Sequence, residues 1–205
     1  MPYPKHKVFI SYYHHDDQFY KDSIITWNKS WDLFEDWSVN DGDIDDTNMS
    51  DEQIRQKIRD EYIKDATVLV LLCGKNTKYR KFIDWELHAS MYDTEKNPKM
   101  GILVVNLPEC NNGVRAIEDR EKEIVAPGGG WTRLNGRADF ESAYPDAPQR
   151  IIDSLVNKRS EITFVDWETI KNNHYLLTEL IDFAFKRRKT MGYDLSQPLR
   201  RRNTN

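Results

Sequence analysis

The feature that most constrains the fold is the apolar run Ala66–Leu72 near the middle of the chain. It shows no alternation of polar and apolar residues, which is typical of a strand that is covered on both faces. Lys7–Ser11 and Met100–Leu107 have the same character. We therefore predict a parallel sheet with Ala66–Leu72 at its centre.

The segments between these runs have helical spacing of apolar residues. One predicted helix follows Ser50–Gln53, whose side chains fit a capping box, and another covers about Ile83–Glu95. Asp32–Trp37 indicates a weaker edge strand. A late strand is expected at Ile162–Trp167 and a last helix at His174–Lys189. Strands alternating with helices predict a flavodoxin-like α/β fold of three layers, with helices on both faces of the sheet.

A chain of 205 residues can bury one full core, so we expect a single domain over residues 1–190. Pro108–Pro148 is rich in loop-forming residues and long for a connection. We therefore expect a loop-rich insertion over residues 108–160. Residues 191–205 are predicted to form a basic, flexible tail.

The composition argues against several classes of protein. A net charge of −4 does not suit nucleic-acid binding, although basic residues gather at Lys186–Lys189 and Arg200–Arg202. No apolar stretch approaches the roughly 20 residues of a membrane helix. The start Met1–Lys5 lacks the apolar core of a signal peptide, and there are only two cysteines. We expect a cytoplasmic protein that binds neither membrane nor nucleic acid.

A metal site is not expected. Asp41, Asp43, Asp45 and Glu52 match ligand positions of a calcium-binding EF-hand loop, but Asp46 stands where that loop needs glycine. We interpret Asp41–Asn48 as a solvated acidic loop.

In sheets of this kind, ligands bind at the carboxyl ends of the strands, where the winding direction reverses. This places Ser11–Asp17 and Cys73–Thr77 on opposite walls of one crevice, and the helix bearing Glu86 follows the second wall. A phosphoacceptor receiver would need a carboxylate at the end of the central strand, where this chain has Leu72-Cys73-Gly74. A flavodoxin would need small residues where this chain has Ser11–His15.

Three features together resemble a TIR domain: Val8–Tyr12 followed by Asp16 and Asp17, an acidic loop before a capped helix, and Arg80–Leu87 with its Trp-Glu pair. The likeness is closest to the TIR-like proteins of the prokaryotic Thoeris antiphage system. It covers Lys5–Pro108 and the closing strand and helix at Glu161–Lys189. Trp85 directly precedes Glu86, whereas the family's form is Trp-Cys-x-x-Glu.

The resemblance implies cleavage of the nicotinamide–ribose bond of NAD⁺, with NAD⁺ as substrate and no further cofactor. Glu86 would be the catalytic group. The expected product is a cyclic or rearranged ADP-ribose signal that activates a separate effector protein. Self-association and a phage-derived trigger are further expected interactions. The residues expected to bind substrate are Phe9, Ser11, Tyr12, Trp37, Cys73, Gly74, Asn76 and Trp85.

Two alternatives remain open from the sequence. A carboxylate near the start of a helix gains about 0.3–1 kcal/mol from the helix dipole, which would explain Glu86 without catalysis. The chain could also be a non-catalytic TIR adaptor that self-associates or docks a partner through its acidic loop.

Overall fold

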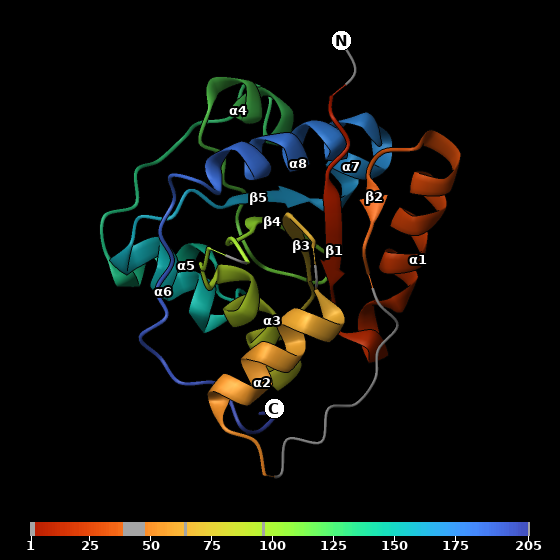
Figure 1. Cartoon of the computed structure of the whole chain (residues 1–205). Coiled ribbons are helices and arrows are strands. Elements are labelled where there is room, and N and C mark those ends of the chain that lie inside the picture. Colours follow the sequence, from red (N-terminus) through yellow and green to blue (C-terminus); the bar gives the residue numbers. More distant parts are fainter. Residues whose placement is uncertain (1–2, 39–47, 64, 96, 205) are drawn as a thin grey trace.

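The computed structural model describes residues 3–38, 48–63, 65–95 and 97–204 (Figure 1). Five strands form one sheet in the order β2-β1-β3-β4-β5, and every neighbouring pair is parallel. The predicted flavodoxin-like α/β fold is therefore confirmed. The strands are β1 (Lys7–Ser11), β2 (Glu35–Asp36), β3 (Val68–Cys73), β4 (Gly101–Asn106) and β5 (Thr163–Asp166).

The predicted central strand is β3, which lies between β1 and β4. All of its residues are buried, and its first residue, Val68, is in register with Val8 of β1 and Gly101 of β4. β2, by contrast, has only two residues and both are exposed. This matches the prediction of a weak strand at an edge.

Helices account for most of the remaining described chain. None of the described helices is long and apolar enough to cross a membrane. A π-helical turn, Ile58–Tyr62, extends α2, and a short 3₁₀ turn, Thr77–Tyr79, precedes α3. The helices are α1 (His14–Trp31), α2 (Asp51–Lys57), α3 (Lys81–Met91), α4 (Asp119–Val125), α5 (Arg137–Ala143), α6 (Gln149–Asn157), α7 (Trp167–Asn172) and α8 (Tyr175–Arg187).

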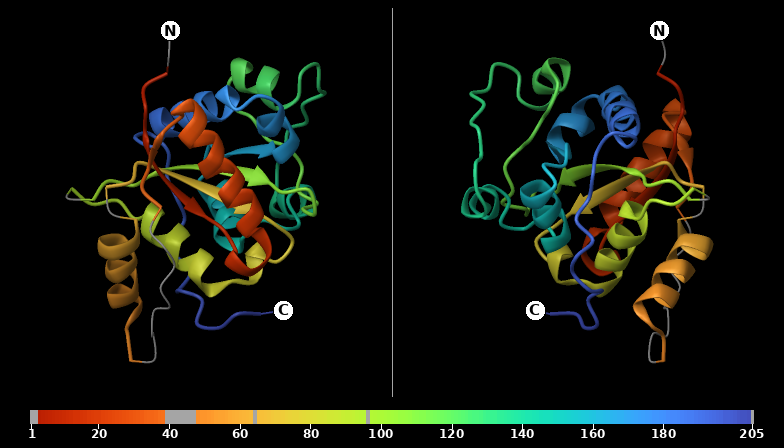
Figure 2. Two further views of the ribbon diagram at one scale, coloured as in Figure 1. Left: turned by 90° about the vertical axis from the view of Figure 1, so that its right-hand side faces the viewer. Right: turned by 60° about the vertical axis from the view of Figure 1, so that its left-hand side comes forward.

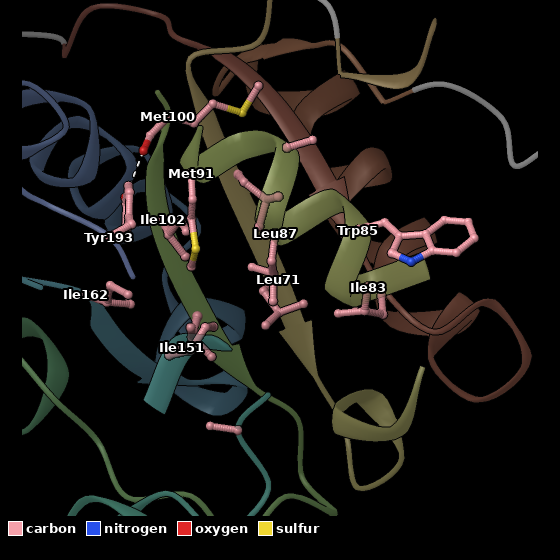
Figure 3. Close-up of a cluster of buried hydrophobic side chains, with 14 of the residues drawn as sticks. Leu71, Ile83, Trp85, Leu87, Met91, Met100, Ile102, Ile151, Ile162 and Tyr193 are labelled. Carbon is pink, nitrogen blue, oxygen red and sulfur yellow. Dashed lines mark hydrogen bonds between the residues drawn. The ribbon is translucent and has the colours of Figure 1, made fainter. Parts of the chain in front are cut away.

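The sheet is covered on both faces, because successive side chains of a strand point to opposite sides. Phe9 of β1 and Leu71 of β3 pack in a core cluster that includes residues of α2, α3 and α6 (Figure 3). Val8 and Ile10 belong to a second cluster with residues of α1, α7 and α8. Figure 2 shows these layers from two further directions. The predicted three-layer arrangement is confirmed.

Two helix starts show how local sequence sets the boundaries. The capping box at α2 is confirmed, since the Gln53 backbone N–H donates to Ser50 Oγ at 3.2 Å and the Ser50 N–H donates to Gln53 Oε1 at 2.8 Å. The sequence suggests Asp16 or Asp17 as a possible cap of the helix after β1, but α1 begins at His14. Asp16 and Asp17 therefore lie inside its first turn and do not occupy the cap position.

The segment expected to be loop-rich, residues 108–160, contains α4, α5 and α6. Ile151 and Leu155 of α6 are part of the core. Glu121 of α4 is fully buried and pairs with both terminal nitrogens of Arg187 in α8, at 2.7 and 2.8 Å. Such a bidentate pair fixes both distance and orientation. It attaches α4 to the end of α8.

The C-terminal segment also differs from the flexible tail expected over residues 191–205. In its described part, Met191, Tyr193 and Leu199 are buried. The Tyr193 hydroxyl donates to the Met100 carbonyl at 2.8 Å (Figure 3), and the Leu199 N–H donates to Asp51 of α2 at 3.0 Å. Scattered apolar residues among the arginines provide enough buried surface to hold the segment against the core.

Gly101 permits α8 to pack closely on β4. A Cβ atom at this position would lie 2.2 Å from the Ala184 carbonyl oxygen, which belongs to the helix backbone and cannot move alone. We predict that Gly101→Ala lowers the free energy of unfolding by about 1–3 kcal/mol or more, measured by urea denaturation. Gly130→Ala is the control, because a Cβ atom added at Gly130 would have no other atom within 4 Å. A Gly101→Ala protein as stable as the control would contradict this packing.

Candidate active site

Ser11 and Glu86 meet at the carboxyl end of β1. The Ser11 hydroxyl donates a hydrogen bond to Glu86 Oε2 at 2.6 Å, a length typical of an O–H donor to a carboxylate. Ser11 is 1% exposed and Glu86 8% exposed. The two residues predicted to be central to the site are therefore in direct contact, although they are far apart in the sequence.

The periodicities of β1 and α3 explain this contact. Ser11 lies two residues after Phe9, so both side chains are on the face of the sheet that α3 covers. In α3, the neighbours Trp85 and Leu87 are fully buried. Glu86 is the sixth of the eleven residues of α3, because the helix begins at Lys81. It is beyond the first turn, and the helix-dipole explanation for this carboxylate does not apply.

The Ser11 hydroxyl gives Glu86 a defined orientation. A carboxylate offers about four lone-pair sites to donors, and Ser11 occupies one of them. A carboxylate that is nearly buried and held by a hydroxyl cannot be hydrated as it would be on a surface. Its charge can therefore act strongly on a cation that forms beside it.

The two predicted walls of the crevice are joined to each other. Asn76 Nδ2 donates to Asp16 Oδ2 at 2.8 Å, and the Thr77 hydroxyl lies 3.5 Å from Asp17 Oδ2. Only glycine fits at position 74 without a shift, since a Cβ atom there would lie 2.7 Å from Asp17 Oδ1. Gly74 and Asn76 thus position the loop after β3 against the start of α1.

Asp17 is the titratable group most altered by this packing. Burial raises its pKa from 3.8 to about 7, assisted by the negative charges of Asp16 and Glu109. Hydrogen bonds from the Tyr13 backbone N–H and from Thr77 oppose the rise. From the sequence, Asp16 or Asp17 could cap a helix. No feature of the sequence indicated that Asp17 would be buried.

Three of the predicted substrate residues lie close to Ser11 in sequence or in the sheet, and each is held by contacts with other groups. Phe9 is 4% exposed and packs in the core beneath Ser11. Tyr12 packs on the α1 face, and its hydroxyl donates to Gln18 at 2.9 Å. The Trp37 ring lies under the Lys7 ammonium, 4.3 Å from its centre, and so points toward the amino end of β1.

Cys73 faces the insertion segment and is fully buried. Its thiol donates to the Asp146 carbonyl at 3.4 Å and lies 4.0 Å from the Cys110 sulfur. The Asn112 amide also donates to the Cys73 sulfur, at 3.4 Å. In this structure Cys73 is a packing residue at the junction of β3 with residues 110–112 and 146.

Trp85 is fully buried and lies against the C-terminal segment. Its indole N–H donates to the Arg200 carbonyl at 2.7 Å, and Figure 3 shows the ring projecting from α3 on the side away from Leu87. Asp84, the residue before Trp85, accepts hydrogen bonds from the Arg150 guanidinium and from the Arg200 backbone N–H. These contacts leave no open face on Trp85 for a substrate ring, contrary to the expectation from sequence.

Arg80 and Tyr13 were not predicted from the sequence, yet they lie together at the entrance to α3. The Arg80 guanidinium stacks 4.1 Å from the centre of the Tyr13 ring. Within the described residues, Arg80 Nε is buried without a hydrogen-bond partner. The sequence signal that could have pointed to Arg80 is its position just before the helix that carries Glu86.

The acidic loop cannot be placed in this site. Of Asp41–Asn48, only Asn48 is among the described residues, so the predictions for Asp41, Asp43 and Asp45 lie outside them. In the described ranges no group of three or more His, Cys, Asp and Glu residues could hold a metal ion.

The raised pKa of Asp17 predicts a specific pH dependence. The folded protein keeps a proton on Asp17 between about pH 4 and 7, where the unfolded chain has released it. Asp17 therefore lowers the free energy of unfolding progressively as the pH rises through that range, and the full decrease is present above about pH 7. Asparagine cannot ionise, so the free energy of unfolding of Asp17→Asn, relative to that of the natural protein, should be higher at pH 8 than at pH 5. Urea denaturation at both values measures this, and a difference that does not change with pH would contradict the assignment.

The position of Trp85 predicts a structural effect of its replacement. Trp85→Phe keeps an aromatic ring but leaves the Arg200 carbonyl without its donor. We expect a loss of about 1–3 kcal/mol in the free energy of unfolding. Trp31→Phe is the control, since Trp31 is 51% exposed and its change should stay within about 0.5 kcal/mol. Equal stability of the two variants would show that the Trp85 contact contributes little.

The comparisons with known proteins support the assignment of this fold to a family. No curated protein matches the sequence. Among solved structures, one similar chain is described as "Structure of the activated Roq1 resistosome directly recognizing the pathogen effector XopQ (TIR domains)", at 12% identity and a TM-score of 0.34, covering 93% of this chain and 88% of that one. The family model described as "Thoeris protein ThsB, TIR-like domain" matches residues 9–112, which include both Ser11 and Glu86. With about half of its length matched by that model, the chain belongs to the TIR-like family of Thoeris ThsB proteins.

Proposed function

We propose that this protein cleaves the nicotinamide–ribose bond of NAD⁺, with Glu86 as the catalytic carboxylate, and that the product is a cyclic or rearranged ADP-ribose signal. The observation that carries the proposal is the nearly buried Ser11–Glu86 pair at the carboxyl end of β1. Membership of the Thoeris family supports a role in antiphage defence, in which the proposed signal would activate an effector protein.

The chemistry requires little more than one well-placed carboxylate. When the bond between ribose C1 and the nicotinamide nitrogen breaks, its electrons leave with neutral nicotinamide. Positive charge develops on the ribose ring, and Glu86 can stabilise it or bind the ribose hydroxyls. An ordinary glycosidase needs a second carboxyl group to protonate its leaving group, and nicotinamide does not.

The topology supports the same location. β1 and β3 are neighbours, and the chain proceeds outward in opposite directions from them, to β2 on one side and to β4 on the other. Ligands of open α/β sheets bind at such a reversal, outside the carboxyl ends of the strands. Ser11 is the last residue of β1, and Glu86 faces it from α3.

Arg80 is suited to the phosphate groups of NAD⁺. Arg80 and Glu86 are separated by six positions on one helix, or roughly 9 Å along its axis. A guanidinium at that distance can reach a phosphate attached to a ribose that lies beside Glu86. Stacking on Tyr13 holds the guanidinium plane in place without neutralising its charge.

Glu86→Gln is the direct test of the proposed reaction. The amide has the shape of the carboxylate and can still accept the Ser11 hydrogen bond, so the fold should be retained. We predict that nicotinamide release from NAD⁺ falls by roughly 100-fold or more, because the negative charge at the reacting ribose is lost. The assay measures nicotinamide with and without extract of phage-infected cells.

Glu123→Gln provides the matched control, since Glu123 is an exposed carboxylate on α4. Its activity should equal that of the natural protein. Equal nicotinamide release by the Glu86 and Glu123 variants would refute the role of Glu86. If neither variant nor natural protein consumes NAD⁺, while Glu86→Gln still protects cells from phage, the non-catalytic adaptor would be the better account.

A further inference from the structure

A cavity of about 430 Å³ lies within the insertion segment. Its walls come only from residues 113–144: the chain before α4, α4 itself, the loop between α4 and α5, and α5. Figure 2 shows this loop arching away from the sheet, whereas Ser11 and Glu86 lie on β1 and α3. The residues that matter chemically are Arg115, Lys122, Trp131, Arg133, Phe140 and Tyr144.

The charged residues that line the cavity are all basic, and one of them, Lys122, is paired with Asp119 outside the lining at 2.8 Å. Arg115, Lys122 and Arg133 line the cavity, and none of its lining residues is acidic. The whole chain, in contrast, has a net charge of −4. A concave site with charges of a single sign raises the local concentration of ligands with the opposite charge.

Arg115 is the cavity's cation with the clearest effect of burial. It is partly buried, and burial lowers its pKa. Its guanidinium donates to the Ile162 carbonyl at 2.8 Å. The charge of Arg187 lowers the pKa of Arg115 further, whereas Tyr144, Glu161 and Glu121 act in the opposite direction. Among the residues that the structure describes, no carboxylate forms an ion pair with Arg115. A partly buried guanidinium without a direct ion pair would be stabilised by an anion that binds beside it.

The cavity also offers aromatic surface. Trp131 is 40% exposed, although it is one of the most apolar side chains in the molecule. Phe140 and the buried Tyr144 add two more rings to the wall, and Tyr144 is held in place by stacking on Phe164 with ring centres 4.5 Å apart. An exposed tryptophan beside arginines can stack on the flat ring of a ligand.

We infer that this cavity binds a nucleotide, with its phosphate at Arg115 and Arg133 and its base against Trp131. Arginine is the side chain best matched to phosphate, because its planar fork can donate two parallel hydrogen bonds. The volume falls in the range of about 300–1,000 Å³ that is usual for small-molecule sites. This site is separate from Glu86, and the inference does not depend on cleavage of NAD⁺.

Isothermal titration calorimetry of the full chain can test the ligand class. The probes are adenosine 5′-monophosphate, adenosine and inorganic phosphate. We expect the monophosphate to bind at least about tenfold more tightly than either of the others, since only it carries both groups. Inorganic phosphate binding as tightly as the monophosphate, or no binding of the monophosphate at millimolar concentration, would overturn the inference.

Variants then locate the site. Arg133→Glu and Trp131→Ala change exposed residues of the cavity and should each weaken monophosphate binding by about tenfold or more. Lys189→Glu makes the same charge change outside the cavity, and Trp31→Ala removes an exposed tryptophan elsewhere, so both should bind normally. Glu86→Gln should also bind normally. Binding that is lost in Glu86→Gln, or that is unaffected in Arg133→Glu and Trp131→Ala, would place the nucleotide elsewhere and refute the site.

Discussion

The hydrogen bond between Ser11 and Glu86 joins the central sheet to the helix beside it and orients the carboxylate on which the proposed reaction depends. It connects the carboxyl end of β1 to the middle of α3 at 2.6 Å. On its own, a glutamate among buried residues would be costly, because a carboxylate loses its hydration there. The Ser11 hydroxyl offsets part of that cost and fixes the direction of the carboxylate. An oriented carboxylate at a strand end is what the proposed chemistry requires.

The register of α3 determines where Glu86 points, and hydrogen bonds from α6 and the C-terminal segment help to fix that register. Asn203 accepts the N–H of Lys81, the first residue of α3, at 2.9 Å. Asp84 and Trp85, the two residues before Glu86, are bound to Arg150 and Arg200. The last residues of the chain therefore contribute to the geometry of the candidate site, although they lie outside the part that matches the family model.

Much of the fold was predictable because the strands carry strong local signals. The buried run that forms β3 and the capping box at Ser50 could be identified from neighbouring residues alone. The orientation of single side chains could not. Tyr12 and Trp37 are adjacent to the crevice in sequence, but packing against α1 and stacking under Lys7 direct them away from it.

The C-terminal segment shows the same limitation. Its arginines suggested a flexible tail, whereas the buried Tyr193 and Leu199 hold it against Met100, just before β4, and against α2. Trp85 could not be recognised as a packing residue without knowing that this segment covers it. The contact between Ser11 and Glu86 was easier to anticipate, because topology alone brings the end of β1 close to the helix that follows β3.

The central claim is that the Ser11–Glu86 site releases nicotinamide from NAD⁺ and retains the ADP-ribose part long enough to rearrange it. Mass spectrometry of NAD⁺ incubated with the purified chain and extract of phage-infected cells tests this most directly. We predict nicotinamide together with either a cyclic ADP-ribose or a rearranged ADP-ribose isomer. The cyclic product contains one water less than linear ADP-ribose, so the two differ in mass. NAD⁺ that remains intact under these conditions would contradict the account.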